Sequence, residues 1–184
     1  MKPPEHAGLH RGKLFDEFEV GQVIRSESRT VTADDIAAFA KLSGDFNPLH
    51  TDEAYARSTP FRGRIAHGLL VQSIASGLAN QTGVFDGTTV AVLEMVIRYA
   101  LPVHPGDEVR IELVVRAMDP EPAPRRGWVR FGTSVRNQRG EVVIEGEWLT
   151  LMHRRRPVRR IGRGAELETP DVEGRSRAAN DVAP

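Results

Sequence analysis

The spacing of apolar residues changes along the chain from a helical period to a strand period. Over residues 33–43 and 67–82, apolar and small side chains recur every three or four positions, as on one face of a helix. From residue 88 the period is two, over the segments 88–101, 108–118, 128–137 and 141–152, which turn-forming sequences separate. This order predicts an α+β fold, in which helix 67–82 covers one face of an antiparallel meander.

Local signals place the other elements. Residues 23–31 alternate as a strand, and Thr32 begins a capping-box-like sequence before helix 33–43, which Gly44 ends. Thr51 or Asp52 is expected to cap a short helix that reaches residue 57. Charged residues recur on the strands, so we expect sheet faces partly open to water. On the first long strand, Glu94 and Arg98 can form an ion pair, or Arg98 can contact a ligand; we favour the pair.

Length and composition restrict the architecture and the class of protein. The length of 184 residues predicts one domain, here 14–152, with a loose arm at 1–13 and a basic, mostly disordered tail at 153–184. The 25 basic and 25 acidic residues balance, which gives no general case for binding nucleic acid or an anionic membrane. Cysteine is absent, which excludes disulfides and thiolate chemistry. With no apolar run of about 20 residues and no visible secretory signal, we expect a soluble cytoplasmic protein.

The sequence DFNPLH at 45–50 carries the clearest chemistry. Side chains five residues apart on a regular helix point about 140° away from each other. Pro48 interrupts such a helix, and Asn47 before it is restricted toward extended geometry. We therefore expect an ordered irregular loop that turns Asp45 and His50 toward one point, where a single water can lie between a base and an acid. Such a pair is the minimum needed to add water to a double bond or to remove it.

This loop and three further segments resemble the MaoC-like dehydratases, which include the (R)-specific enoyl-CoA hydratases. The segments are RIAHGLL at 64–70, FDEFEVGQ at 15–22 and ALPVHPGDEV at 100–109, and the resemblance covers about residues 14–152. It implies a hot-dog fold, an antiparallel sheet wrapped around the central helix 67–82. It also implies an acyl-CoA thioester as substrate, no separate cofactor, and a homodimer or higher oligomer whose sheets join edge to edge.

Hydration of a 2-enoyl thioester needs a base, a proton donor and a group that holds the enolate oxygen. We expect Asp45 to activate the water, and His50 to hold it and to exchange the proton at C2, with syn addition as the resemblance implies. The backbone N–H of Gly68 is the expected oxyanion donor, because the first turn of a helix has unpaired N–H groups. Asn47 is expected to orient the loop or to bind the water.

Other residues are predicted to bind substrate or to have structural roles. Ser76 matches a serine that lines the site in the family, and arginines near the loop are candidates for the CoA phosphates: Arg57, Arg62 and Arg64. His67 is expected to be structural. The six histidines show no metal-ligand spacing, so no metal site is predicted.

Two other functions remain open on the sequence alone. Hot-dog proteins also include thioesterases, and a fold does not determine an activity. The third possibility is a non-catalytic protein that binds a CoA ligand, or that binds nucleic acid through the basic tail. No aromatic residue interleaves with the tail arginines, which weakens the case for nucleic-acid binding. Loss of the enoyl absorbance distinguishes hydration from release of a free thiol, and deletion of 154–184 tests the binding function.

Overall fold

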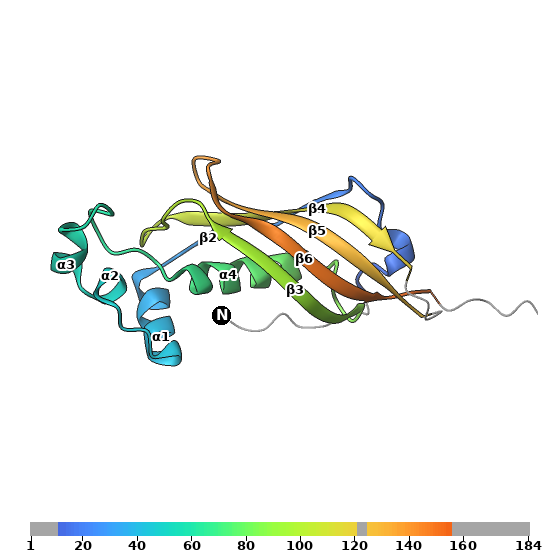
Figure 1. The fold of residues 1–184 in the computed structure, drawn as a ribbon, viewed down its shortest axis with the longest axis horizontal. Coiled ribbons are helices and arrows are strands. Elements are labelled where there is room, and N and C mark those ends of the chain that lie inside the picture. Colours follow the sequence, from blue (N-terminus) through green and yellow to red (C-terminus); the bar gives the residue numbers. More distant parts are fainter. Residues whose placement is uncertain (1–10, 121–124, 156–184) are drawn as a thin grey trace, which may run out of the picture.

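The computed structural model describes residues 11–120 and 125–155, and these form one twisted antiparallel sheet around a helix (Figure 1). The strand order is β1-β4-β5-β6-β3, and β2 also pairs with β4. The strands are β1 (Val23–Arg25), β2 (Arg29–Thr30), β3 (Thr89–Tyr99), β4 (Glu108–Asp119), β5 (Arg126–Asn137) and β6 (Val142–His153). The helix inside the curve is α4 (Gly68–Gln81). The predicted α+β hot-dog architecture is confirmed.

The core lies between α4 and the concave face of the sheet. Alternate residues of β4 are buried, and the intervening residues face outward, as expected for a sheet covered on one side. On α4, Ala75 is fully buried, and its small side chain lets the helix approach the strands closely. The main contributors share this interior and are Leu70, Val71, Ile74, Leu78, Val109, Ile111, Leu113, Val115, Val129, Phe131 and Val135.

Helix α1 (Ala33–Ser43) begins and ends where its sequence predicts. The Thr32 hydroxyl accepts a hydrogen bond from the backbone N–H of Asp35 at 3.0 Å, and the Asp35 carboxylate accepts one from the N–H of Thr32 at 2.9 Å. Gly44 ends the helix with a φ of 77°, a left-handed conformation that glycine adopts without steric cost. The chain is thereby turned sharply at the start of the DFNPLH segment.

The single strand predicted over 23–31 is wrong, because the strand is broken into β1 and β2. Arg25 pairs with Glu112, and Arg29 pairs with Val109. The segment between Arg25 and Arg29 is therefore one residue longer than the segment of β4 opposite it. Ser26 bridges the break through two hydrogen bonds of 3.0 Å to the backbone of β4. An extra residue of this kind is a bulge, which bends an edge strand.

The ion pair predicted between Glu94 and Arg98 is also wrong. Arg98 instead pairs with Glu145 on the neighbouring strand β6, at 3.3 Å. Residues four apart on one strand are separated by about 13 Å, whereas directly opposite residues have Cβ atoms about 5 Å apart. The partner was therefore set by strand register, which the sequence did not reveal.

The ends of the described chain are held at the far end of α4. The predicted arm 1–13 lies mostly outside the described residues, but Gly12 and Lys13 donate backbone hydrogen bonds to Asp86 at 2.7 Å and Val84 at 2.8 Å. The predicted tail 153–184 also lies mostly outside them. His153, however, ends β6, and Arg154 and Arg155 follow it in the described part of the chain.

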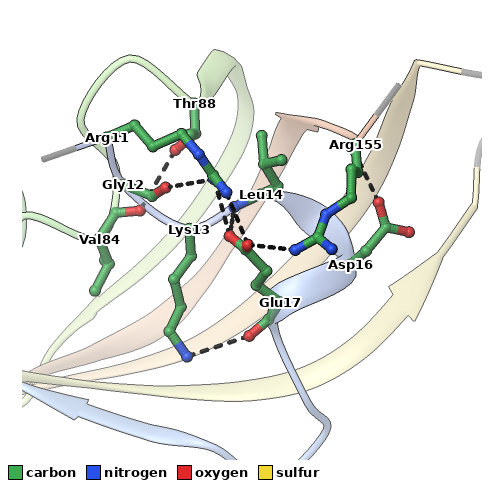
Figure 2. A network of polar contacts seen from close by, with 9 residues as sticks. All are labelled: Arg11, Gly12, Lys13, Leu14, Asp16, Glu17, Val84, Thr88 and Arg155. Carbon is green, nitrogen blue, oxygen red and sulfur yellow. Dashed lines mark hydrogen bonds and ion pairs between the residues drawn. The ribbon is translucent and has the colours of Figure 1, made fainter. Parts of the chain in front are cut away.

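An ion-pair network joins the two ends (Figure 2). The 3₁₀-helix η1 (Phe15–Glu17) presents Asp16 to Arg154 at 2.7 Å and Glu17 to Arg155 at 2.9 Å, while Arg11 also binds Glu17 at 2.9 Å. The hydrogen bond from Arg154 lowers the pKa of Asp16, and that from Arg11 lowers the pKa of Glu17, helped by the N–H of Leu14 and by Arg155. Both carboxylates are therefore charged at neutral pH.

Within residues 11–120 and 125–155, no helix combines the length and the apolar character needed to cross a bilayer. The longest helix, α4, has 14 residues.

Candidate active site

The DFNPLH segment follows α1 and lies in the group of short helices beyond the N-terminal end of α4 (Figure 1). It contains a short helix, α2 (Pro48–Thr51), so the prediction of a wholly irregular loop is wrong. Pro48 interrupts a continuation of α1 but occupies the first turn of α2, where its missing N–H costs nothing. Asn47 caps this turn by accepting a hydrogen bond from the N–H of Leu49 at 3.0 Å. The structure thus supports the expectation that Asn47 shapes the loop.

Three hydrogen bonds join this segment to the residues that lead into α4. The N–H of Ile65 donates to the carbonyl of Leu49 at 3.1 Å, and Nδ1 of His50 bonds to the carbonyl of Ile65 at 2.8 Å. Nε2 of His67 bonds to the backbone carbonyl of Asp45 at 3.0 Å. As a result, Asp45, His50 and His67 each have a side-chain N or O atom within 4.8 Å of the others. The predicted meeting of Asp45 and His50 is confirmed as geometry.

The hydrogen bonds determine which atoms of the pair are available for chemistry. Because a carbonyl oxygen only accepts, the neutral form of His50 carries its proton on Nδ1 and has its lone pair on Nε2. Oδ1 of Asp45 accepts a hydrogen bond from the N–H of Asn47 at 3.2 Å, which fixes the carboxylate relative to its own loop. Asp45 is exposed and His50 half-buried, so a ligand can reach both. The arrangement offers one carboxylate oxygen and one imidazole nitrogen as proton acceptors.

The same three side chains have the composition of a metal site, but their orientation favours hydrogen bonding. The rings of His50 and His67 stack with 3.8 Å between centroids and 32° between planes. Imidazole binds a metal through a lone pair in the plane of its ring, and lone pairs of stacked rings do not converge on a point about 2.1 Å from both nitrogens. Asp45 and His50 are better arranged to share a water.

Gly68 is the first residue of α4, as the predicted oxyanion donor requires. The helix cap, His67, makes no side-chain hydrogen bond to the first turn, whose N–H groups therefore keep their partial positive charge. A Cβ at position 68 would lie 2.5 Å from Cε1 of Tyr99, so only glycine fits beneath this ring without displacement. Tyr99 was missed by the sequence analysis, because it reads as an ordinary aromatic residue at a strand end.

The other predicted substrate-binding residues are more scattered. Ser76 lies eight residues after Gly68 on α4, about 12 Å along the helix axis, so it is not part of the cluster around Asp45. Arg57 and Arg64 both pair with Glu53, at 2.8 and 3.3 Å. The hydrogen bond from Arg57, with that from Arg64, lowers the pKa of Glu53 and keeps it charged.

Arg62 differs from its two neighbours in sequence. It has a φ of 58°, the only positive φ of a non-glycine residue in the described segments. Such a conformation costs about 1–2 kcal/mol for a residue with a Cβ. Its backbone N–H closes a turn to the carbonyl of Thr59 at 3.1 Å, and its side chain is exposed. Among the described residues it has no carboxylate partner, so its charge is available to a ligand.

Comparison with known proteins identifies the family of the chain. The sequence model of the MaoC like domain matches residues 17–133. An (R)-specific enoyl-CoA hydratase of Aeromonas caviae is 39% identical over 130 residues, which cover 71% of this chain and 92% of that protein. A 3-hydroxybutyryl-CoA dehydratase of Methylorubrum extorquens is 32% identical over 137 residues, with 73% and 81% covered. The R-hydratase PhaJ1 of Pseudomonas aeruginosa, solved unliganded, superimposes with a TM-score of 0.64 at 35% identity, covering 77% of this chain and 85% of that one.

These matches and the fold place the chain in the MaoC-like family of hot-dog proteins. The family, with its named hydratase and dehydratase members, defines the chain as an enzyme of the hydro-lyase class.

Proposed function

We propose that this protein catalyses the reversible hydration of a 2-enoyl-CoA to an (R)-3-hydroxyacyl-CoA. The observation that carries the proposal is the set of three hydrogen bonds that brings Asp45 and His50 together beside the first residue of α4. The similarity to named (R)-specific hydratases supports the R configuration and the CoA thioester. We further infer that the protein acts in the cytoplasm.

The reaction uses one water held between the two side chains. Asp45 accepts a hydrogen bond from one O–H group of the water. This hydrogen stays on the water oxygen, and the bond increases the electron density with which that oxygen attacks C3. Nε2 of His50 accepts the other hydrogen and passes it to C2 on the same face of the double bond. Hydroxyl and hydrogen are thus added from one water molecule, and His50 returns to its neutral form. Dehydration is the reverse sequence.

Negative charge flows to the thioester oxygen as the C3–O bond forms. The N–H of Gly68, at the positive end of the α4 dipole, is the proposed donor to this oxygen. A fixed donor of this kind contributes about 2.7–4 kcal/mol of transition-state stabilisation. Because the donor is backbone, the side chain at position 68 matters only through the space that it occupies.

A spectroscopic assay on purified protein tests the proposal. With a short trans-2-enoyl-CoA, we expect the conjugated enoyl absorbance to disappear while the thioester remains, and chiral analysis to give the R alcohol. Release of free CoA at the same rate, with the enoyl group intact, would identify a thioesterase. Absence of both reactions with a panel of chain lengths and branches, alongside tight ligand binding, would indicate a binding protein.

Arg62 is the proposed contact for a phosphate of CoA, because Arg57 and Arg64 are both already paired with the carboxylate of Glu53. We expect Arg62→Gly to raise KM for an enoyl-CoA by about tenfold and to preserve kcat, because about tenfold corresponds to the free energy of one charge-assisted hydrogen bond. The melting temperature should be unchanged or higher, because glycine relieves the positive φ at this position.

Two controls isolate the phosphate. The KM of an enoyl-pantetheine thioester, which lacks the nucleotide phosphates, should not respond to Arg62→Gly. Arg57→Gln should alter KM for the CoA substrate less than Arg62→Gly does. An equal rise in KM for both substrates would show that Arg62 acts on loop structure and does not bind phosphate.

The edge strand β3 is the proposed site of homodimer formation. It is the last strand of the sheet, and apolar side chains on both of its faces are exposed, including Leu93 (54%), Val96 (52%) and Tyr99 (51%). An uncovered edge of this kind pairs readily with a second strand. Since Tyr99 lies over Gly68, a second copy on β3 would also cover the proposed oxyanion donor.

The double substitution Leu93→Lys, Val96→Lys is expected to give a monomer, because like charges would meet across the new edge contact. Light scattering measures the mass, and the melting temperature of the wild type, but not of the variant, should rise with protein concentration. Lysines at Val114 and Ser134, on the outer face of strands inside the sheet, add the same two charges and provide the matched control. A wild-type protein that is monomeric at micromolar concentration would contradict the assignment.

A further inference from the structure

His67 precedes α4 but does not act as an ordinary helix cap. Residues at this position commonly accept a hydrogen bond from the first turn through a short polar side chain. The ring of His67 instead turns away from the helix, makes no such bond, and is only 3% exposed. Its backbone carbonyl accepts the first helical hydrogen bond, from Val71 at 3.1 Å. The side chain is therefore free for another role.

One contact of that ring holds the backbone of Asp45. Nε2 of His67 donates to the carbonyl oxygen of Asp45 at 3.0 Å, across 22 positions of sequence. The bond requires the proton on Nε2, which leaves the lone pair on Nδ1, an atom that is buried with no partner among the described residues. This single bond connects Asp45, which bears the proposed water-activating carboxylate, to the residue before the proposed oxyanion donor.

A second contact holds the ring of His50. The two imidazoles stack at 3.8 Å between centroids, and Phe39 of α1 contacts His67 at 5.0 Å with a 54° angle between planes. The bond from His50 to the carbonyl of Ile65 fixes one edge of the His50 ring, and the face of His67 limits how far that ring can tilt. His67 thus contacts both members of the pair, the backbone of Asp45 and the ring of His50.

We propose that His67 is a positioning residue, which sets the distance between the Asp45 carboxylate and Nε2 of His50 for the hydration reaction. The inference rests on the proposed function. Its two contacts are chemically separable, because one needs an N–H donor and the other needs a flat ring. Misplacement of reacting groups by about 1 Å can cost about a hundredfold in rate, so each contact should matter to kcat more than to binding.

Two variants separate the contacts. His67→Phe keeps a ring against His50 but loses the bond to Asp45, whereas His67→Gln keeps an N–H donor of similar reach but loses the ring. We expect each to lower kcat by at least about tenfold and to leave KM within about threefold of wild type. His104→Phe is the matched control: His104 makes the same kind of bond, from Nδ1 to the carbonyl of Arg64 at 3.0 Å, and contacts neither member of the pair.

The kinetic outcomes decide between positioning and stability. If kcat of both His67 variants stays within about twofold of wild type, the proposal is wrong. It is also wrong if their losses match that of His104→Phe and follow the fall in melting temperature, since a purely structural role predicts this. Loss of kcat at constant KM, in variants that remain folded at the assay temperature, supports positioning.

A readout independent of activity separates this proposal from the proposed function. In ¹⁵N-histidine spectra of the full-length protein, we expect His67 as the Nε2–H tautomer and His50 as the Nδ1–H tautomer, with the His50 signals shifted in His67→Phe. A His67 proton on Nδ1, or His50 signals unchanged by His67→Phe, would overturn the positioning role even in an active enzyme. If the wild type hydrates no enoyl thioester while the spectra agree, the proposed function fails and the His67 contacts stand.

Discussion

Asp45→Asn is expected to lower kcat for enoyl-CoA hydration by about 10²–10⁴-fold, the usual contribution of a side chain that takes part in general acid–base catalysis. Asparagine has nearly the same shape and retains an oxygen that can accept the hydrogen bond from the N–H of Asn47, so the loop should keep its conformation. The charge that polarises the water is lost. The measurement is the initial rate of enoyl absorbance loss at saturating substrate, together with circular dichroism and thermal melting.

Asp52→Asn is the matched control for this substitution. Asp52 caps α3 (Glu53–Arg57) by accepting a hydrogen bond from the N–H of Tyr55 at 3.0 Å, which asparagine can also accept. The same chemical change seven residues away should leave kcat close to wild type. His50→Ala should resemble Asp45→Asn in its effect on kcat. Near-normal turnover of Asp45→Asn would show that another group activates the water.

Gly68→Ala is expected to lower kcat by about 10²–10³-fold with a smaller effect on KM, the loss typical of a removed oxyanion donor. The new methyl group would lie 2.5 Å from the Tyr99 ring, so either the ring moves or the methyl group occupies the approach to the N–H. Crowding at a developing charge affects the transition state more than the bound substrate. Steady-state kinetics with one enoyl-CoA measures both parameters.

Two further variants distinguish the sources of that loss. Gly77→Ala adds the same methyl group on the same helix, where nothing lies within 4 Å; it should stabilise α4 by about 0.5–1 kcal/mol and leave kcat unchanged. A Gly68→Ala, Tyr99→Ala double variant has no Tyr99 ring, so the clash between that ring and the new methyl group is removed. Recovery of kcat in this double variant would assign the loss to displaced Tyr99, whereas persistent loss assigns it to the blocked amide. A Gly68→Ala enzyme with raised KM and normal kcat would remove Gly68 from the chemistry.

The sequence predicted those features that depend on local chemistry. The caps at Thr32 and Gly44 are properties of a few adjacent residues, and the change of period at residue 88 depends only on neighbouring side chains. The Asp45–His50 pair was predicted because a proline-containing segment restricts its own backbone. For the caps and the change of period, the determining interactions span fewer than about ten residues. The geometry of the pair, by contrast, also depends on hydrogen bonds to Ile65 and His67, 15 and 22 positions away.

The features that were missed depend on contacts between distant segments. The partner of Arg98 follows from the register between β3 and β6, and the break at Ser26 follows from an extra residue opposite β4. Tyr99 over Gly68 and His67 against His50 both arise from packing between elements 15 or more residues apart. No local pattern distinguishes these residues from ordinary strand or helix-end positions.

The ion pairs of Arg154 and Arg155 with η1 fix where the polypeptide leaves the domain. They lie at the opposite end of the sheet from α1 and α2, the helices that flank Asp45 in the sequence (Figure 1). A resin, a fluorescent label or a second enzyme attached at Arg155, the last described residue, would therefore leave the helices around Asp45 facing the bulk solution. Immobilised preparations should retain the turnover of the free enzyme.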